Sequence, residues 1–167
     1  MIEENLEISR RMFKHACAFL DCAKYCQTEP NNIEYRMHSH AVAGIVNSAF
    51  ACEVYIKSLL VFHGEQVDKV KGHELTVLWE KYRNKDSEMA LAIEQGMKAW
   101  FNSQNEKMFD ELLDVCSNAF EYWRYIYEKS EGTVNINFLR GLALVLRSAC
   151  CQAFYGMSWD DFKQSKL

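Results

Sequence analysis

Two oppositely charged side chains interrupt an apolar stretch of the sequence. Glu53 and Lys57 lie four residues apart in a run from Asn47 to Leu60 that is otherwise mainly apolar. Four residues make about one helical turn, so the two side chains can meet on one face of a helix. A carboxylate and an ammonium placed this close to a core must pair with each other or with a third group. The spacing therefore predicts a polar site against the core of a helical protein.

His73 is a candidate ligand contact at the start of the next expected helix. It follows Gly72 and precedes Glu74. The functional interpretation is a contact to a phosphate or a base, helped by the free backbone N–H groups of a helix start. The structural interpretation is a histidine that caps the helix or packs against it. The second interpretation is favoured locally, because the Glu74 carboxylate suits the dipole of a first helical turn.

Arg124 is the candidate arginine of the site. Glu121 precedes it by three residues and Glu128 follows it by four, so helical salt bridges are expected to hold its guanidinium. Its aromatic neighbours on the helical wheel predict a half-buried side chain. The functional interpretation pairs Arg124 with Glu53 across the bundle, at a polar pocket for a phosphate or a nucleotide. The structural interpretation is an ion pair that only fixes how the helices align, and buried pairs often have no other role.

A metal site is a weaker candidate. Cys22 and Cys26 lie one turn apart on the first expected helix, and His38 and His40 lie where the second one begins. In an antiparallel hairpin these four side chains can approach one another as tetrahedral zinc ligands. The set lacks the closely spaced Cys-x-x-Cys of many zinc sites. The sequence therefore predicts no metal and no other cofactor.

Few residues interrupt the helical pattern that must position these side chains. The 167 residues include one proline and seven glycines, and apolar residues recur at helical spacing almost throughout. We expect one domain, residues 1–167, built as an all-α antiparallel bundle of five to six helices with short connections. The expected helices cover about residues 2–26, 39–63, 73–82, 87–100, 106–129 and 137–155.

Composition and charge exclude several classes of protein. The net charge of −4 and the pI of about 5.7 lack the basic excess of a protein that stays on nucleic acid. The acidic start of the chain and seven cysteines, an odd number, predict reduced thiols in a cytoplasmic protein. No stretch is expected to reach the apolar length that spanning a membrane requires. The cations left to form a local basic patch are Arg36, Lys57, Lys81, Arg83, Lys85, Arg140 and Arg147.

Three motifs follow one another along the chain: the helix with Glu53 and Lys57, the helix start at residues 72–75, and the aromatic segment 120–125 with Arg124. Their order resembles that of the HEPN family, the helical "higher eukaryotes and prokaryotes nucleotide-binding" domains. Many HEPN members resemble ribonucleases in which a histidine follows an arginine after four to six residues. Here no histidine follows Arg124, and none lies beyond His73. The resemblance implies a helical homodimer without the usual ribonuclease motif.

The resemblance also implies a range of functions. The preferred hypothesis is a non-catalytic or atypical HEPN domain that binds a nucleotide, RNA or a protein partner in a prokaryotic defence or toxin–antitoxin setting. A nucleotidyltransferase or an antitoxin is the expected kind of protein partner. The polar centre would then comprise Glu53, Lys57, His73 and Arg124. One alternative is a metal-independent ribonuclease toxin that uses Arg124 with His73. The other is a purely structural dimerisation module with a large apolar face and no polar pocket.

Overall fold

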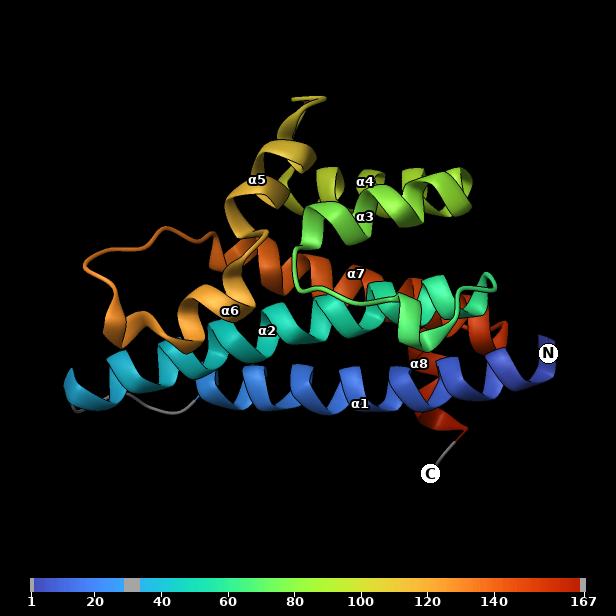
Figure 1. Ribbon diagram of the computed structural model, residues 1–167, viewed down its shortest axis with the longest axis horizontal. Coiled ribbons are helices and arrows are strands. Elements are labelled where there is room, and N and C mark those ends of the chain that lie inside the picture. Colours follow the sequence, from blue (N-terminus) through green and yellow to red (C-terminus); the bar gives the residue numbers. More distant parts are fainter. Residues whose placement is uncertain (1, 29–33, 166–167) are drawn as a thin grey trace.

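The computed structural model describes residues 2–28 and 34–165, and the side chains of residues 3–26 and 40–165. Within these ranges the chain forms helices and no strand, so the predicted all-α bundle is confirmed (Figure 1). Two short 3₁₀ turns, Val67–Lys69 and Ile126–Glu128, lie in the connections. The helices are α1 (Ile2–Thr28), α2 (Glu34–Phe62), α3 (Leu75–Lys85), α4 (Ser87–Phe101), α5 (Met108–Cys116), α6 (Ala119–Arg124), α7 (Ile136–Tyr155) and α8 (Trp159–Gln164).

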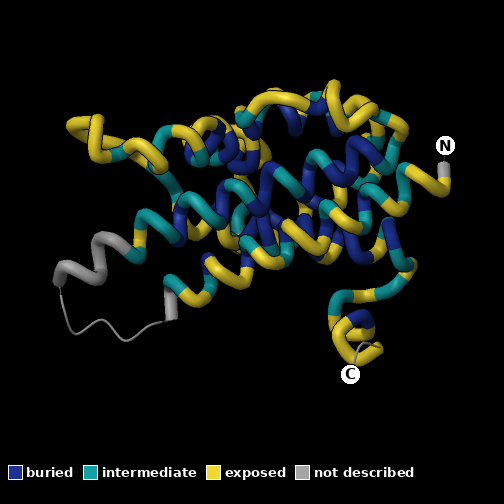
Figure 2. The backbone as a smooth tube through the Cα atoms, turned by 60° about the horizontal axis from the view of Figure 1, so that its bottom comes forward, coloured by how far each residue is buried: buried dark blue, intermediate teal, exposed yellow. Residues whose placement is uncertain are grey.

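α2 is the central helix of the bundle. It packs most extensively against α1 and also contacts α3, α6 and α7. In Figure 1, α1 and α2 run side by side in opposite directions, and α3 and α4 lie above them. Buried residues gather where these helices face each other, while the outer turns are exposed (Figure 2). A polar side chain on α2 therefore has several neighbouring elements within reach.

Burial on several sides explains why α2 is so apolar. By length and composition, its segment His40–Phe62 is long and apolar enough to cross a membrane, with a mean hydropathy of 1.5. The expectation that no stretch reaches this apolar length was therefore wrong. In the bundle 67% of an 18-residue window of this segment is buried inside the protein, as in the core helix of a folded domain.

The expected long helix over residues 106–129 is divided in the structure. α5 ends at Cys116, a turn follows at Ser117 and Asn118, and α6 ends at Arg124. The turn is held by α3: the N–H of Leu75 donates to the carbonyl of Ser117 at 3.0 Å, and the N–H of Thr76 donates to the Ser117 hydroxyl at 3.2 Å. Because of this division and of α8, the described part of the chain has more helices than the five to six predicted.

The last helix, α8, docks on the outside of the α1–α7 pair. Phe13 of α1 lies within 6.3 Å, between ring centroids, of Trp159 and within 5.8 Å of Phe162. Arg10 of α1 donates from Nε and Nη2 to the carbonyl of Phe154, at 3.1 and 2.7 Å, and so satisfies a carbonyl at the end of α7. The aromatic contacts hold α8 beside a polar stretch of α7, and the Arg10 bonds hold α1 to the end of α7.

Candidate functional site

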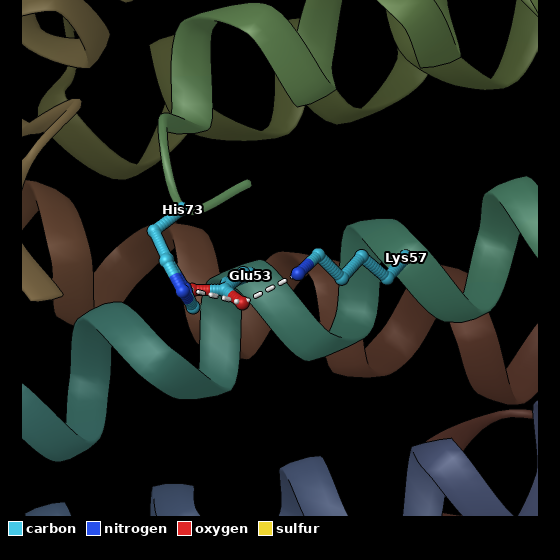
Figure 3. Close-up of polar contacts among 3 residues, drawn as sticks. All are labelled: Glu53, Lys57 and His73. Carbon is cyan, nitrogen blue, oxygen red and sulfur yellow. Dashed lines mark hydrogen bonds and ion pairs between the residues drawn. The ribbon is translucent and has the colours of Figure 1, made fainter. Parts of the chain in front are cut away.

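Glu53 is a buried carboxylate in the middle of α2. Its side chain is 2% exposed, and Oε1 accepts a hydrogen bond from Nζ of Lys57 at 2.7 Å (Figure 3). The predicted i, i+4 pair is therefore confirmed. The Lys57 side chain is 14% exposed, so its ammonium keeps some contact with water. The pair lets α2 carry a charge against the core, because the ammonium offsets part of the desolvation cost of the carboxylate.

His73 is the third member of this polar cluster. Its Nδ1 lies 3.1 Å from Oε1 and 3.0 Å from Oε2 of Glu53 (Figure 3). A carboxylate accepts hydrogen bonds, so Nδ1 of His73 carries the proton and donates a hydrogen bond to Glu53. Gly72 has a φ of 92°, a conformation that favours glycine, and it turns the chain so that His73 faces α2. We call Glu53, Lys57 and His73 the polar triad.

The second ring nitrogen of His73 is available for a ligand. Nε2 has no hydrogen-bond partner within the described part of the chain, and the His73 side chain is 38% exposed. The carboxylate of Glu53 fixes both the tautomer and the orientation of the ring. With Nδ1 protonated, Nε2 of the neutral ring is an acceptor, and it becomes a donor when the ring is charged. Such a histidine can bind a ligand or take part in proton transfer.

A shallow cavity of about 320 Å³ lies beside His73, at the small end of the range of ligand pockets. The loop before α3 forms most of its wall, the first turn of α3 adds two apolar side chains, and α6 adds Glu121. The cavity brings one basic side chain together with two acidic ones, so it favours neither sign of charge strongly. Its lining residues are Lys71, Gly72, His73, Glu74, Val77, Leu78 and Glu121.

Phe120 connects the polar triad to Arg124. The ring centroid of Phe120 lies 5.1 Å from that of His73, and Cζ of Arg124 lies 4.9 Å from the same centroid. Phe50 of α2 stacks on Phe120 at 4.6 Å and fixes the ring against the bundle. The imidazole and the guanidinium therefore contact one aromatic ring from two different elements.

The predicted surroundings of Arg124 were wrong in three respects. Arg124 is exposed rather than half-buried, and it forms no ion pair with Glu53. It also forms none with Glu121, which lies on the same helix, or with Glu128, because α6 ends at Arg124 and the next turn does not continue the helical spacing toward Glu128. Its Nη2 instead donates to the Tyr125 hydroxyl at 3.0 Å.

The expected free N–H groups beside His73 are partly occupied. α3 begins at Leu75, two residues later than expected, and the N–H groups of Leu75 and Thr76 both donate to Ser117. A phosphate at this helix start would have to compete with those bonds. Glu74 occupies the N-cap position without a side-chain capping bond, so His73 does not cap α3 and instead packs against the Phe120 ring.

The candidate metal ligands do not assemble among the described residues. Cys22 is exposed, Cys26 is half-buried, and no group of three His, Cys, Asp or Glu side chains with described positions is placed to hold a metal. His40 is half-buried, and its Nδ1 has no hydrogen-bond partner in the described chain. His38 lies outside the residues whose side chains are described, so the four-ligand set stays a prediction.

Most cations expected for a basic patch are paired with acids. Lys81 and Lys85 both contact Glu65 at 2.8 Å, and these bonds lower the pKa of Glu65 to about 2. Arg83 pairs with Glu94 and Asp110. The Arg36 side chain is not described, and Arg140 is exposed. Sequence reasoning missed Ser117, which fixes the start of α3, and the burial of Arg147 in α7.

No family model, curated protein or solved structure gives a significant match to this chain. The resemblance to the HEPN family therefore rests on the sequence motifs, and membership of that family stays a proposal.

Proposed function

We propose that this chain is a HEPN-like binding domain that takes a nucleotide or single-stranded RNA at a surface formed by His73 and Arg124. One observation carries the proposal: a buried carboxylate, Glu53, orients His73 and leaves Nε2 free beside a cavity. Holding an imidazole in this way costs a buried charge, which a packing histidine does not require. The arrangement therefore favours a ligand contact over packing alone.

The surroundings of Arg124 support RNA as the ligand. The Arg124 guanidinium is exposed, and a guanidinium can donate two parallel hydrogen bonds to a phosphate. Tyr125 and Tyr127 next to it are 40% and 76% exposed, and exposed rings can stack with bases. We infer that Arg124 binds the backbone, that the tyrosines contact bases, and that His73 contacts one further polar group of the ligand.

A specific observation also favours the ribonuclease alternative. His73 has its Nδ1 on a carboxylate and its Nε2 free, which is the arrangement that a general acid–base histidine needs. Arg124 contacts the same Phe120 ring and would hold the scissile phosphate. In this alternative Nε2 takes the proton of a 2′-hydroxyl, and purified protein should cleave RNA in the presence of a metal chelator.

The remaining parts of the proposal come from the family resemblance. We infer a homodimer, and a nucleotidyltransferase or an antitoxin as partner in a defence or toxin–antitoxin setting. The purely structural dimerisation module is less well supported, because it requires no polar pocket, whereas Lys71, Glu74 and Glu121 line the cavity beside His73. Light scattering of the purified protein measures the oligomeric state directly.

The binding test uses a fluorescein-labelled single-stranded RNA and, separately, adenosine monophosphate. We expect His73→Ala and Arg124→Ala each to weaken RNA binding roughly tenfold or more, because each removes a directed polar contact. Arg140→Ala removes an exposed arginine from α7 and serves as the matched control, with unchanged affinity. If wild-type protein binds neither probe, or if all three variants bind equally, the proposal is wrong.

Cleavage of the same RNA decides between the two functions. The binding proposal predicts intact RNA after incubation with wild-type protein in the presence of a chelator. The ribonuclease alternative predicts cleavage that is lost in His73→Ala. Cleavage that survives in His73→Ala would exclude His73 as the catalytic residue.

A further inference from the structure

A cavity of about 960 Å³ lies where α1, α7 and the beginning of α8 meet. It shares no lining residue with the cavity beside His73, so its function is independent of the one proposed above. α7 contributes a row of polar residues to it, although this helix is otherwise one of the core helices. The polar and aromatic side chains that matter for its chemistry are Lys24, Arg147, Gln152, Trp159 and Lys163.

Arg147 is a buried arginine that forms no ion pair within the described part of the chain. The residue is 8% exposed, and its Nε is buried without a hydrogen-bond partner among the described residues. Cζ lies 4.1 Å from the ring centroid of Trp159, a cation–π contact that recovers only part of the lost hydration. A guanidinium in this position is costly unless an anion completes its bonding.

Each of the two carboxylates that line the cavity pairs with a lysine that also lines it. Asp21 lies 3.8 Å from Lys24, and Asp160 lies 2.8 Å from Lys163, in each case one turn along the same helix. The described lining thus carries one positive charge more than negative charges, and Arg147 itself forms no ion pair within the described chain, although Asp160 feels its charge. Burial and the neighbouring charge of Arg147 lower the pKa of Lys24, which agrees with a positive potential here.

We propose that this cavity binds the phosphate group of a small molecule, with Arg147 as its main donor. The planar guanidinium offers several N–H groups in a fork that matches two phosphate oxygens. Lys163 and Lys24 add charge at the rim, where their side chains are 53% and 36% exposed. The cavity is larger than a phosphate requires, so an organic part of the ligand fits beside Trp159 and Leu144.

The test compares the thermal unfolding of the protein in inorganic phosphate, phenyl phosphate and sodium acetate, each against sodium chloride at equal ionic strength. Ligands that bind only the folded protein raise the melting temperature. We expect both phosphates to raise it and acetate to have no effect. We expect Arg147→Met to weaken binding of phenyl phosphate roughly tenfold or more, measured by calorimetry. Arg140→Met changes an exposed arginine of the same helix and should bind normally.

Because Arg147 is buried without an ion pair among the described residues, Arg147→Met should fold and melt no lower than wild type in chloride. If it does not fold, Lys163→Gln replaces it, with an expected loss of affinity for phenyl phosphate of roughly threefold or more. The proposal is overturned if neither phosphate stabilises wild-type protein or if acetate stabilises it equally. It is also overturned if Arg147→Met folds and binds phenyl phosphate as well as wild type, or if Arg147→Met does not fold and Lys163→Gln binds it as well as wild type.

Discussion

The substitution Glu53→Gln tests whether the polar triad is coupled in the way the distances imply. Glutamine keeps the size and one acceptor oxygen of Glu53 but removes its charge. Lys57 then loses the oxygen that it contacts at 2.7 Å as an ion pair, and His73 loses a carboxylate at 3.0 Å. We expect the variant to fold with reduced stability.

The expected size of the effect follows from the burial of the three side chains. Removing one partner of a fully buried ion pair costs about 3–5 kcal/mol. Here only Glu53 is fully buried: the side chains of Lys57 and His73 are 14% and 38% exposed and can turn partly toward water. We therefore expect a loss of about 2–3 kcal/mol, or a decrease of the melting temperature by roughly 5–10 °C for a chain of this size.

Urea unfolding of a double-mutant cycle measures the coupling. Lys57→Met removes the ammonium and keeps an unbranched side chain, and the double variant Glu53→Gln/Lys57→Met leaves no unpaired charge between the two positions. The double variant should be more stable than the sum of the single effects predicts, by about 1–2 kcal/mol. Glu80→Gln makes the same charge change at an exposed position of α3 and should alter stability little.

Two results would refute this reasoning. Glu53→Gln with the stability of wild type would mean that the buried carboxylate is not held by charge. Additive effects of the two substitutions would mean that Glu53 and Lys57 do not depend on each other in solution.

Two further predictions concern the loop that carries His73 and the acid that links the end of α2 to α3. Gly72→Ala places a side chain at a φ of 92°, so it should lower the free energy of unfolding by about 1–2 kcal/mol and weaken RNA binding. The control Gly64→Ala has the same φ but lies outside the cavity, so it should lose the same stability and bind RNA normally. Equal RNA affinity of the two variants would contradict the role of Gly72. Glu65→Gln should lose at most about 1 kcal/mol at neutral pH. Hydrogen bonds from Lys81 and Lys85 depress the pKa of Glu65 from its ordinary value of 4.5 to about 2. The stability that Glu65 contributes is therefore complete above pH 4.5 and disappears as the pH falls through 2. Urea unfolding from pH 7 to pH 2 measures it, and a stability difference between variant and wild type that grew on acidification would contradict this prediction.

Local features of the sequence predicted the helices and one half of the site. Few breakers and a regular apolar spacing gave the all-α class, and the i, i+4 spacing of Glu53 and Lys57 gave their contact, because both depend only on neighbours along one helix. The helix expected to end near residue 63 ends at Phe62, and Gly64 just beyond it has a φ of 92°.

The partner of Glu53 across the bundle could not be predicted from neighbours along the sequence. Placing Arg124 opposite Glu53 assumed an unbroken helix, but the chain turns at Ser117 because that residue bonds to Leu75 and Thr76 of α3. No glycine or proline marks this turn. The break is a tertiary effect, and it brings His73 rather than Arg124 to the carboxylate.

The burial of Arg147 could not be predicted for a related reason. In the sequence it is a charge within an apolar run and a candidate for an exposed basic patch. Its burial depends on α8, whose Trp159 lies over the guanidinium and whose position depends in turn on contacts with Phe13 of α1. Only a packed structure brings these three helices together.

Glu53 is proposed to hold His73 with Nδ1 protonated and Nε2 free for the ligand. Nitrogen-15 chemical shifts of the His73 ring, recorded during titration with the single-stranded RNA, measure this directly. We expect a protonated Nδ1 throughout and a change of the Nε2 shift that saturates with the RNA, while the same titration of Arg124→Ala requires more RNA. If the Nε2 shift stays constant while the RNA binds, or if Nδ1 is unprotonated in the free protein, Glu53 does not present His73 to the ligand.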